Sequence, residues 1–245
     1  MRRYFVTNKE SIRLNKYLSE QGVCSRREAD DYIARGKVTV DGKKAVMGER
    51  VTGQEQICLM GQRIKKSEME HIYIALNKPR GITCTTKNDK NNVIDYLQLE
   101  RRVFPVGRLD KDSQGLLILT SDGKIVNPMM RAASGHDKEY VVTVDRPIDQ
   151  TFIEKMAGGI YLEELDVTTR PCTVQKLNQK TFSIILTQGL NRQIRRMCQA
   201  LGFKVITLKR IRIMNIRLGD LKPGCWRYLT EQELSELKRR ISRKM

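Results

Sequence analysis

Helix signals follow one another closely near the N-terminus, and they constrain the fold of this chain more than any other feature of its sequence. Leu14 and Leu18 lie one helical turn apart, and Gly22 follows at a position typical of a helix C-cap. Ser25 and Glu28 have the spacing of a capping box at the start of a second helix. These signals predict two short helices in succession.

A β-hairpin is predicted directly after the second helix, which Gly36 ends. In residues 37–46, alternating residues flank Asp41-Gly42, a pair that accepts the positive φ of a type I′ turn. Two helices and a hairpin in so short a segment predict a small α+β module.

The rest of the chain predicts short apolar strands mixed with helices. We expect strands over residues 72–76, 103–106, 116–120, 140–144, 182–186 and 205–208, and helices over residues 149–156 and 191–201. Asp149 can cap the first of these helices and Gly158 can end it. With a linker at residues 65–68, the prediction is an α+β chain. It has a small domain over residues 1–67 (core 11–60) and a mixed, mainly antiparallel body over residues 68–245.

Positive charge is concentrated at the two ends of the chain. Residues 1–67 hold 15 Lys and Arg against 8 Asp and Glu, residues 68–185 hold 16 against 16, and residues 186–245 hold 15 against 4. Two basic surfaces around a neutral body suit a polyanion gripped at two places. An acidic membrane surface is the alternative, but only Leu234 and Leu237, with Ile241, suggest a suitable amphipathic helix. We therefore expect a nucleic acid partner, no membrane contact and a cytoplasmic location.

The N-terminal motifs resemble a known RNA-binding module. The series R-L-N-K-Y-L, S-R-R-E-A and G-K-V-T-V-D-G is similar to the S4 RNA-binding domain over residues 11–60; an unrelated basic α+β module is the alternative. The helical side chains that we expect to contact RNA are Arg13, Lys16, Arg26 and Arg27.

The sequence lacks the motifs of several common classes of enzyme. The sequence has no G-x-x-x-x-G-K-[ST] phosphate loop, no G-x-G-x-x-G after a strand and no H-E-x-x-H. Its six cysteines form no C-x-x-C pair, and its only histidines are His71 and His136. We therefore expect no metal site, no nucleotide and no other cofactor.

One long motif indicates a specific chemistry. Residues 106–120, V-G-R-L-D-K-D-S-Q-G-L-L-I-L-T, resemble the G-R-L-D motif of pseudouridine synthases. Three further motifs follow the order of that family: N-K-P-R-G at residues 77–81, K-E-Y-V-V at residues 138–142 and Q-G-L-N-R-Q-I-R-R-M-C at residues 188–198. Together they resemble the synthases that carry an S4 domain, which are type A for 16S rRNA and types B, E and F for 23S rRNA. The resemblance to type F is the greatest.

The resemblance implies roles for three residues. Asp110 corresponds to the catalytic carboxylate, although an Asp before a strand is usually a turn residue or half of a surface ion pair. Tyr140 corresponds to the tyrosine that stacks on the target uracil, where a core tyrosine is the common alternative. Arg108 is implied to hold the RNA helix open when the uridine is flipped out; otherwise it is a plain phosphate contact.

Arg195 is our candidate for the cation that keeps Asp110 ionised in a closed pocket. At about 100° per residue, Arg195 borders the apolar stripe of its helix, whereas Arg192 and Arg196 face the polar side and are expected to meet phosphate. Three solvated arginines are the alternative. The remaining expected RNA contacts are Lys78, Lys111, Leu190, Asn191 and Gln193.

The sequence therefore predicts isomerisation of a specific uridine to pseudouridine in a stem-loop of 23S rRNA by a monomeric enzyme. Asp110 can attack C1′ or C6, or take a proton from the sugar, and the sequence does not choose among these routes. A 16S rRNA or tRNA target is one alternative. A noncatalytic S4-type RNA-binding or ribosome assembly factor is the other.

Overall fold

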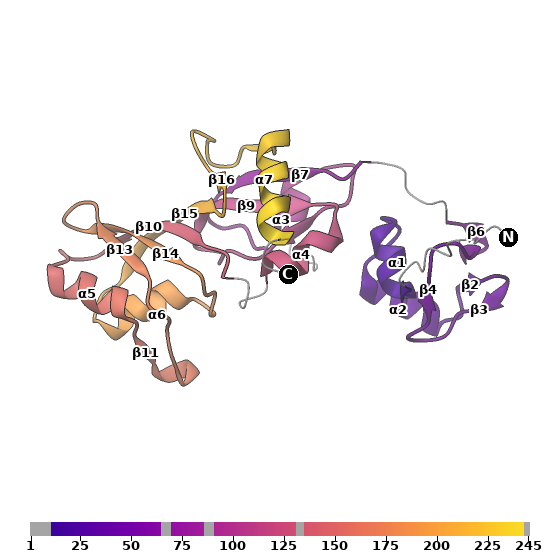
Figure 1. The fold of residues 1–245 in the computed structure, drawn as a ribbon, viewed down its shortest axis with the longest axis horizontal. Helices are drawn as coiled ribbons and strands as arrows, with labels where there is room; N and C mark the ends of the chain where they lie inside the picture. The colour runs from indigo at the N-terminus through magenta and orange to yellow at the C-terminus, as the bar shows by residue number, and fades with distance from the viewer. Residues whose placement is uncertain (1–10, 65–69, 86–90, 131–134, 243–245) are drawn as a thin grey trace, which may run out of the picture. The chain divides into compact units, whose positions relative to one another are not determined.

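The chain divides into two compact units in the computed structural model, Met1–His71 and Ile72–Met245 (Figure 1). The structure describes residues 11–64, 70–85, 91–130 and 135–242. The predicted linker at residues 65–68, and with it the predicted boundary after residue 67, lies outside the described residues.

The N-terminal unit is a small α+β domain. Its elements are β1 (Ile12–Arg13), α1 (Leu14–Glu20), α2 (Arg26–Ala34), β2 (Val38–Val40), β3 (Lys43–Lys44), β4 (Arg50–Val51), β5 (Ile57–Leu59) and β6 (Gln62–Arg63). Strands β3-β2-β5-β6 form one sheet, and β1 pairs with β4. Leu14 and Leu18 of α1 pack with Ile33 of α2 and Ile57 of β5 in one buried cluster.

The local signals of this unit formed as predicted. The backbone N–H of Glu28 donates to Ser25 Oγ at 3.1 Å, and the N–H of Ser25 donates to Glu28 Oε2 at 2.6 Å, which confirms the capping box. Asp41 and Gly42 have φ values of 48° and 79°, as a type I′ turn requires.

Three of the predicted RNA-binding cations lie around one surface hollow of the N-terminal unit. Arg13, Lys16 and Arg26 line a hollow of about 260 Å³, and Arg50 from β4 completes its basic wall. Arg27 does not line it. Because cations around a hollow can meet one phosphate from several sides, this surface is suited to an RNA backbone.

A single charge removal in this hollow tests its use. We expect Arg26→Gln to weaken RNA binding and to reduce the slope of log K against log salt by about 0.7 to 0.9, one lost phosphate contact. Binding isotherms over a range of salt concentrations measure the slope, and a melting curve checks that the fold is intact. An unchanged slope in a folded variant would contradict a phosphate contact at Arg26.

The C-terminal unit is built on a nine-stranded sheet. Its elements are β7 (Tyr73–Lys78), α3 (Val93–Leu97), β8 (Phe104–Val106), β9 (Gln114–Thr120), α4 (Gly123–Met130), β10 (Lys138–Val144), α5 (Gln150–Gly158), β11 (Tyr161–Leu162), the 3-10 helix η2 (Glu163–Leu165), β12 (Val167–Thr168), β13 (Thr173–Lys176), β14 (Thr181–Leu186), α6 (Gln193–Ala200), β15 (Val205–Ile213), β16 (Ile216–Arg217), β17 (Trp226–Tyr228) and α7 (Glu231–Ser242). The central order is β13-β14-β10-β15-β9-β7-β17, with β16 beside β15 and β8 beside β9. The pairings are antiparallel except that of β9 with β15, so the predicted mixed, mainly antiparallel body is confirmed.

Apolar clusters pack on both halves of this sheet, one on the β14 side of the β9–β15 pairing and one on its β7 side. At the β14 end, α5 and α6 pack on β10 and β14 through Phe152, Met197 and Phe182, and Figure 1 shows both helices there. At the β7 end, Ile118 of β9 and Leu237 of α7 share a second cluster. None of the helices in the described residues is long and apolar enough to span a bilayer.

Some predicted element ends were wrong. Asp149 caps α5 through a 2.8 Å bond from the N–H of Phe152, and the helix continues past the predicted residue 156 to Gly158, with Gly159 (φ +98°) as its C-cap. Helix α6 begins at Gln193 and not at residue 191, because Arg192 has a left-handed φ of 52°. Strand β15 continues past the predicted residue 208 to Ile213. Helices α3 and α4 were not predicted, and only the spacing of Leu234, Leu237 and Ile241 had suggested α7.

Gly115 makes the parallel junction of the sheet possible. It pairs with Arg210, and a Cβ added at Gly115 would lie 2.2 Å from the Arg210 carbonyl oxygen. Its φ of +107° is also one that L side chains rarely adopt. No other residue type fits here without moving β15.

We therefore expect Gly115→Ala to lower the free energy of unfolding by at least about 2 kcal/mol, through overpacking and backbone strain. Gly123→Ala is the matched control, because nothing lies within 4 Å of its added Cβ, and its effect should stay within about 1 kcal/mol. Urea unfolding followed by circular dichroism measures both. Equal stability of the two variants would contradict the close approach at Gly115.

Candidate active site

A cavity of about 400 Å³ lies among the loop of residues 107–113, strands β10 and β15 and the segment that leads into α6. Eight of the predicted site residues line it together: Arg108, Asp110, Tyr140, Leu190, Asn191, Arg192, Gln193 and Arg195. The topology brings them together, because the loop enters β9 and β9 pairs with β15, which pairs with β10.

The loop that carries Asp110 is held by buried groups. Its Leu109 side chain is buried, and the N–H of Leu109 donates to Cys84 Sγ at 3.4 Å. The N–H of Ser113 donates to the Asp110 carbonyl at 3.0 Å, which closes a turn around the carboxylate. The segment that follows β7 also holds this loop, because the Gly81 N–H donates to the Lys111 carbonyl at 2.8 Å. The carboxylate therefore sits on a fixed backbone.

Lys78 belongs to this support and does not face RNA. Its side chain is fully buried, and its ammonium donates to the carbonyls of Pro79 at 2.8 Å and Ile82 at 2.7 Å, with a longer contact to Lys111 at 3.5 Å. Burial lowers the pKa of Lys78. The predicted direct RNA contact does not fit this position, because the donors are used on the interior backbone. The exposed side chain of Lys111 remains available for RNA.

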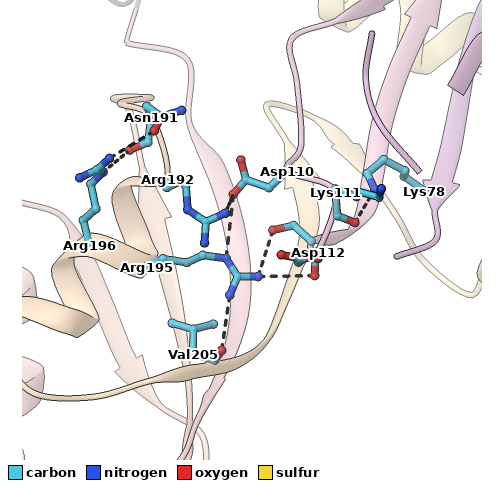
Figure 2. A network of polar contacts seen from close by, with 10 residues as sticks. Lys78, Asp110, Lys111, Asp112, Asn191, Arg192, Arg195, Arg196 and Val205 are labelled. Atoms are coloured by element: carbon cyan, nitrogen blue, oxygen red, sulfur yellow. Dashed lines mark hydrogen bonds and ion pairs between the residues drawn. The ribbon is translucent and has the colours of Figure 1, made fainter. Parts of the chain in front are cut away.

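Two guanidinium groups from the start of α6 face Asp110 (Figure 2). Asp110 Oδ2 lies 3.8 Å from Arg192 Nη1 and 3.9 Å from Arg195 Nε. Arg192 is thus as near to the carboxylate as Arg195, although the helical periodicity placed it on the polar side. Its left-handed backbone, outside the regular helix, turns it toward Asp110.

The two arginines differ in burial and in their other contacts. The side chain of Arg195 is 14% exposed and that of Arg192 is 43% exposed. Arg195 also reaches the Asp112 carbonyl at 3.4 Å, Ser113 Oγ at 3.5 Å and the Val205 carbonyl at 3.4 Å. Burial, and next the charge of Arg192, lower the pKa of Arg195, while Asp110 opposes that shift. Arg195 therefore fixes the loop of Asp110 to α6 and β15.

The remaining predicted residues of this segment have varied surroundings. Arg196 donates to the Asn191 carbonyl at 3.0 Å and pairs with Glu164, so part of its charge is already compensated. Gln193 is buried, and its Oε1 accepts from the N–H of Leu190 at 3.0 Å, which suits support of the turn better than contact with RNA. Asn191 is exposed and lines the cavity with Leu190.

A β-bulge decides which side chains of β15 face the cavity. The register of β10 and β15 shifts between Glu139 and Tyr140, so Lys138 pairs with Ile213 while Tyr140 pairs with Arg210. The extra residue breaks the alternation of β15 and turns both Arg210 and Ile213 toward the cavity, on the face shared by Tyr140. Sequence analysis missed Arg210 because nothing in the sequence signals the bulge.

The cavity is strongly basic around one carboxylate. Such a site can bind a nucleotide of a polyanion and hold one ionised acid next to it. Among the described residues, no group of three or more His, Cys, Asp or Glu side chains could hold a metal ion. The fold and the site thus define a nucleic-acid enzyme with a carboxylate at its centre.

Comparison with known families identifies the class. A family model described as RNA pseudouridylate synthase matches residues 72–200, and a model of the S4 domain matches residues 12–57. The chain belongs to the RNA pseudouridylate synthase family, and it carries an S4 domain. The resemblance read from the motifs is confirmed, and the noncatalytic alternative is set aside.

Individual relatives agree. The chain is 49% identical to the dual-specificity RNA pseudouridine synthase RluF of Escherichia coli strain K12, over 93% of this chain and 78% of the relative. It is 38% identical to the ribosomal large subunit pseudouridine synthase B of Bacillus subtilis strain 168, over 92% of this chain and 95% of the relative. A crystal structure of a pseudouridylate synthase matches 93% of this chain and 100% of that chain, with a TM-score of 0.67 and 29% identity.

The difference in burial between the two arginines predicts different effects of mutation. Arg195→Met should lower turnover about 100-fold, because it removes the buried cation beside Asp110, and should change RNA affinity little. Arg192→Met should mainly weaken RNA binding, because its exposed charge can also meet phosphate. Single-turnover rates and filter binding separate the two effects. Equal losses of binding in both variants would contradict this division of labour.

Proposed function

We propose that this enzyme converts a specific uridine in a stem-loop of 23S rRNA to pseudouridine, with Asp110 as its essential carboxylate. One observation carries the proposal: Asp110 lies in a cavity of nucleotide size, against Arg192 and Arg195, with Tyr140 in the same wall. Isomerisation of uridine replaces the N1–C1′ bond by a C5–C1′ bond, and it consumes no second substrate.

Asp110 has three routes open to it. Its carboxylate can attack C1′, attack C6, or take a proton from the sugar, and each needs the ionised form. The guanidinium groups of Arg192 and Arg195 lie 3.8 and 3.9 Å from this carboxylate, so two positive charges face it across the cavity.

The target base must leave its helix to enter the cavity. We propose that Tyr140, which is half-buried on β10, stacks on the uracil and accepts or relays the C5 proton. Arg108 is exposed at the cavity wall and suits a place in the opened RNA helix. Lys111, Asn191 and Arg192 then contact the flanking backbone, and the basic hollow of the S4 domain contacts it at a second place.

The names of the relatives support the choice of RNA. The Bacillus subtilis relative is named for the large ribosomal subunit, which favours a 23S rRNA target. The Escherichia coli relative is called dual-specificity, which favours testing a second RNA, with tRNA and 16S rRNA as the candidates. We propose that the enzyme acts in the cytoplasm as a monomer.

The target prediction is tested by incubating the enzyme with 23S rRNA, 16S rRNA and tRNA that lack modification. New pseudouridines are mapped by carbodiimide-dependent stops of reverse transcription. We expect a stop in a 23S rRNA stem-loop. Stops in 16S rRNA or tRNA alone would contradict the proposed target and leave the activity standing.

The role of Asp110 is tested by Asp110→Asn, which keeps the size of the side chain and removes its charge. Release of tritium from RNA labelled at uracil C5 should fall below detection, because no carboxylate remains to attack or to take a proton. RNA binding should persist or tighten, since a negative charge has left a site that faces phosphates. A rate within about tenfold of wild type, a loss of only ~1.4 kcal/mol, would refute the assignment.

A further inference from the structure

Two cations of the cavity have no part in the roles assigned above. Arg210 is only 3% exposed, and its Nε donates to the Leu116 carbonyl at 2.7 Å. Its Nη1 lies 3.4 Å from the Arg108 carbonyl. Its Nη2 is buried and has no hydrogen-bond partner among the described residues. A buried guanidinium nitrogen without an acceptor is costly, so a ligand atom that accepts from it would be favoured.

Lys138 is the second cation. Its Nζ donates to the His136 carbonyl at 3.1 Å, which uses one of the three donors of an ammonium group. Lys138 and Tyr140 stand two residues apart on β10 and line the same cavity. Burial lowers the pKa of Lys138, and the charge of Arg210 lowers it further, so the two cations are close enough to repel each other.

The acids next to Lys138 in sequence are committed elsewhere. Glu139 Oε2 accepts from Arg212 Nε at 2.7 Å, and Asp137 pairs with the same guanidinium. Arg212 thereby neutralises the carboxylates on both sides of Lys138. The positive charge of Lys138 and Arg210 is therefore left to act on whatever enters the cavity.

Negative charge develops on the uracil ring during this reaction by every route considered. When C1′ is attacked or the sugar loses a proton, the N1–C1′ bond breaks and its electron pair leaves with N1, spreading over the two ring carbonyls. When C6 is attacked, the electron pair of the C5–C6 double bond moves toward O4. Later, C5 bonds to C1′ as the bond from Asp110 to C1′ or C6 breaks, or as Asp110 returns the proton that it took from the sugar. The C5 proton then leaves and N1 gains a proton, so the atoms balance without a co-reactant.

We propose that Lys138 and Arg210 form the site that receives the uracil carbonyl oxygens and stabilises the negative charge on the ring while the N1–C1′ bond is broken. This inference rests on the proposed function. Donors fixed in advance where charge develops act most strongly in a cavity with little water. The close approach at Gly115 holds Arg210 in place, and Arg212 pairs with both acids next to Lys138, although the charge of Asp137 still opposes part of the lowering of the Lys138 pKa. The site complements Asp110, because it stabilises the ring while the carboxylate attacks C1′ or C6 or takes the sugar proton.

Lys138→Met is the main test, because Arg210 also holds backbone carbonyls and its variants can fail to fold. Single-turnover reaction of uridine should slow about 100-fold, with RNA affinity unchanged within threefold. Lys138→Arg should restore most of the rate, because it keeps the charge. Lys209→Met is the matched control. Lys209 adjoins Arg210 on β15 but does not line the cavity, so this variant should retain the wild-type rate.

A second substrate separates charge stabilisation from a structural role. In RNA carrying 5-fluorouridine at the target, fluorine withdraws electrons and the ring bears negative charge more readily. Consumption of 5-fluorouridine is monitored by digestion of the RNA and mass spectrometry. The fold-loss in rate caused by Lys138→Met should be at least about ten times smaller for 5-fluorouridine than for uridine. If the two losses differ by less than threefold, or if Lys138→Met reacts with uridine within threefold of wild type, the inference is wrong.

Failure of the inference can be told from failure of the proposed function. If the wild-type enzyme forms pseudouridine in none of the RNAs, the proposed substrates are wrong. The second case has an active wild type and an inactive Asp110→Asn variant. If Lys138→Met then reacts with uridine within threefold of wild type, or loses uridine and 5-fluorouridine rates to within threefold of each other, only the inference fails.

Discussion

The parallel pairing of β9 with β15 is the contact on which the active site depends. It joins the two parts of the sheet, and it forms only because Gly115 lets the Arg210 backbone come closer than any side chain would allow. The same contact places the loop of Asp110, which enters β9, beside β15 and the segment before α6. The Arg210 guanidinium then bonds to backbone on both sides of that loop, at Arg108 and Leu116. The close contact between Gly115 and the Arg210 backbone thus holds both the sheet and the active site together.

The charged side chains of the cavity form two groups, one around Asp110 and one made of Lys138 and Arg210. Asp110 faces the guanidinium groups of Arg192 and Arg195. Lys138 and Arg210 stand in the wall of the same cavity, while the acids beside Lys138 are paired with Arg212. Burying these cations costs free energy, and that cost is met by the apolar clusters packed on the sheet at both ends. The arrangement suits a reaction in which a carboxylate acts on one reacting centre while the leaving base takes up electrons.

Local signals in the sequence were sufficient for the two helices and the hairpin of the S4 domain, but not for its strands β1, β4, β5 and β6. In the body they located β7, β8, β9, β10, β14 and β15. Capping boxes, Asp-Gly turns and apolar runs act over a few residues, so they are readable without tertiary structure. Helix α4 was missed because it contains Pro128, and the end of β15 was missed because its charged residues interrupt the apolar run. The G-R-L-D motif led to Asp110, and helical periodicity led to Arg195. The bulge that turns Arg210 toward the cavity, and the left-handed backbone of Arg192, depend on tertiary contacts that the sequence does not show.

The central claim is that the Asp110 carboxylate acts directly on the flipped nucleotide. A crystal structure of the enzyme with a stem-loop RNA that carries 5-fluorouridine at the target position tests it most directly. The account predicts the base inside the cavity, an Asp110 oxygen within about 3.5 Å of C1′, C6 or the sugar proton's carbon, and Arg195 against that carboxylate. A base seated in the cavity with another carboxylate, such as that of Asp112, nearest to the reacting atoms would contradict it.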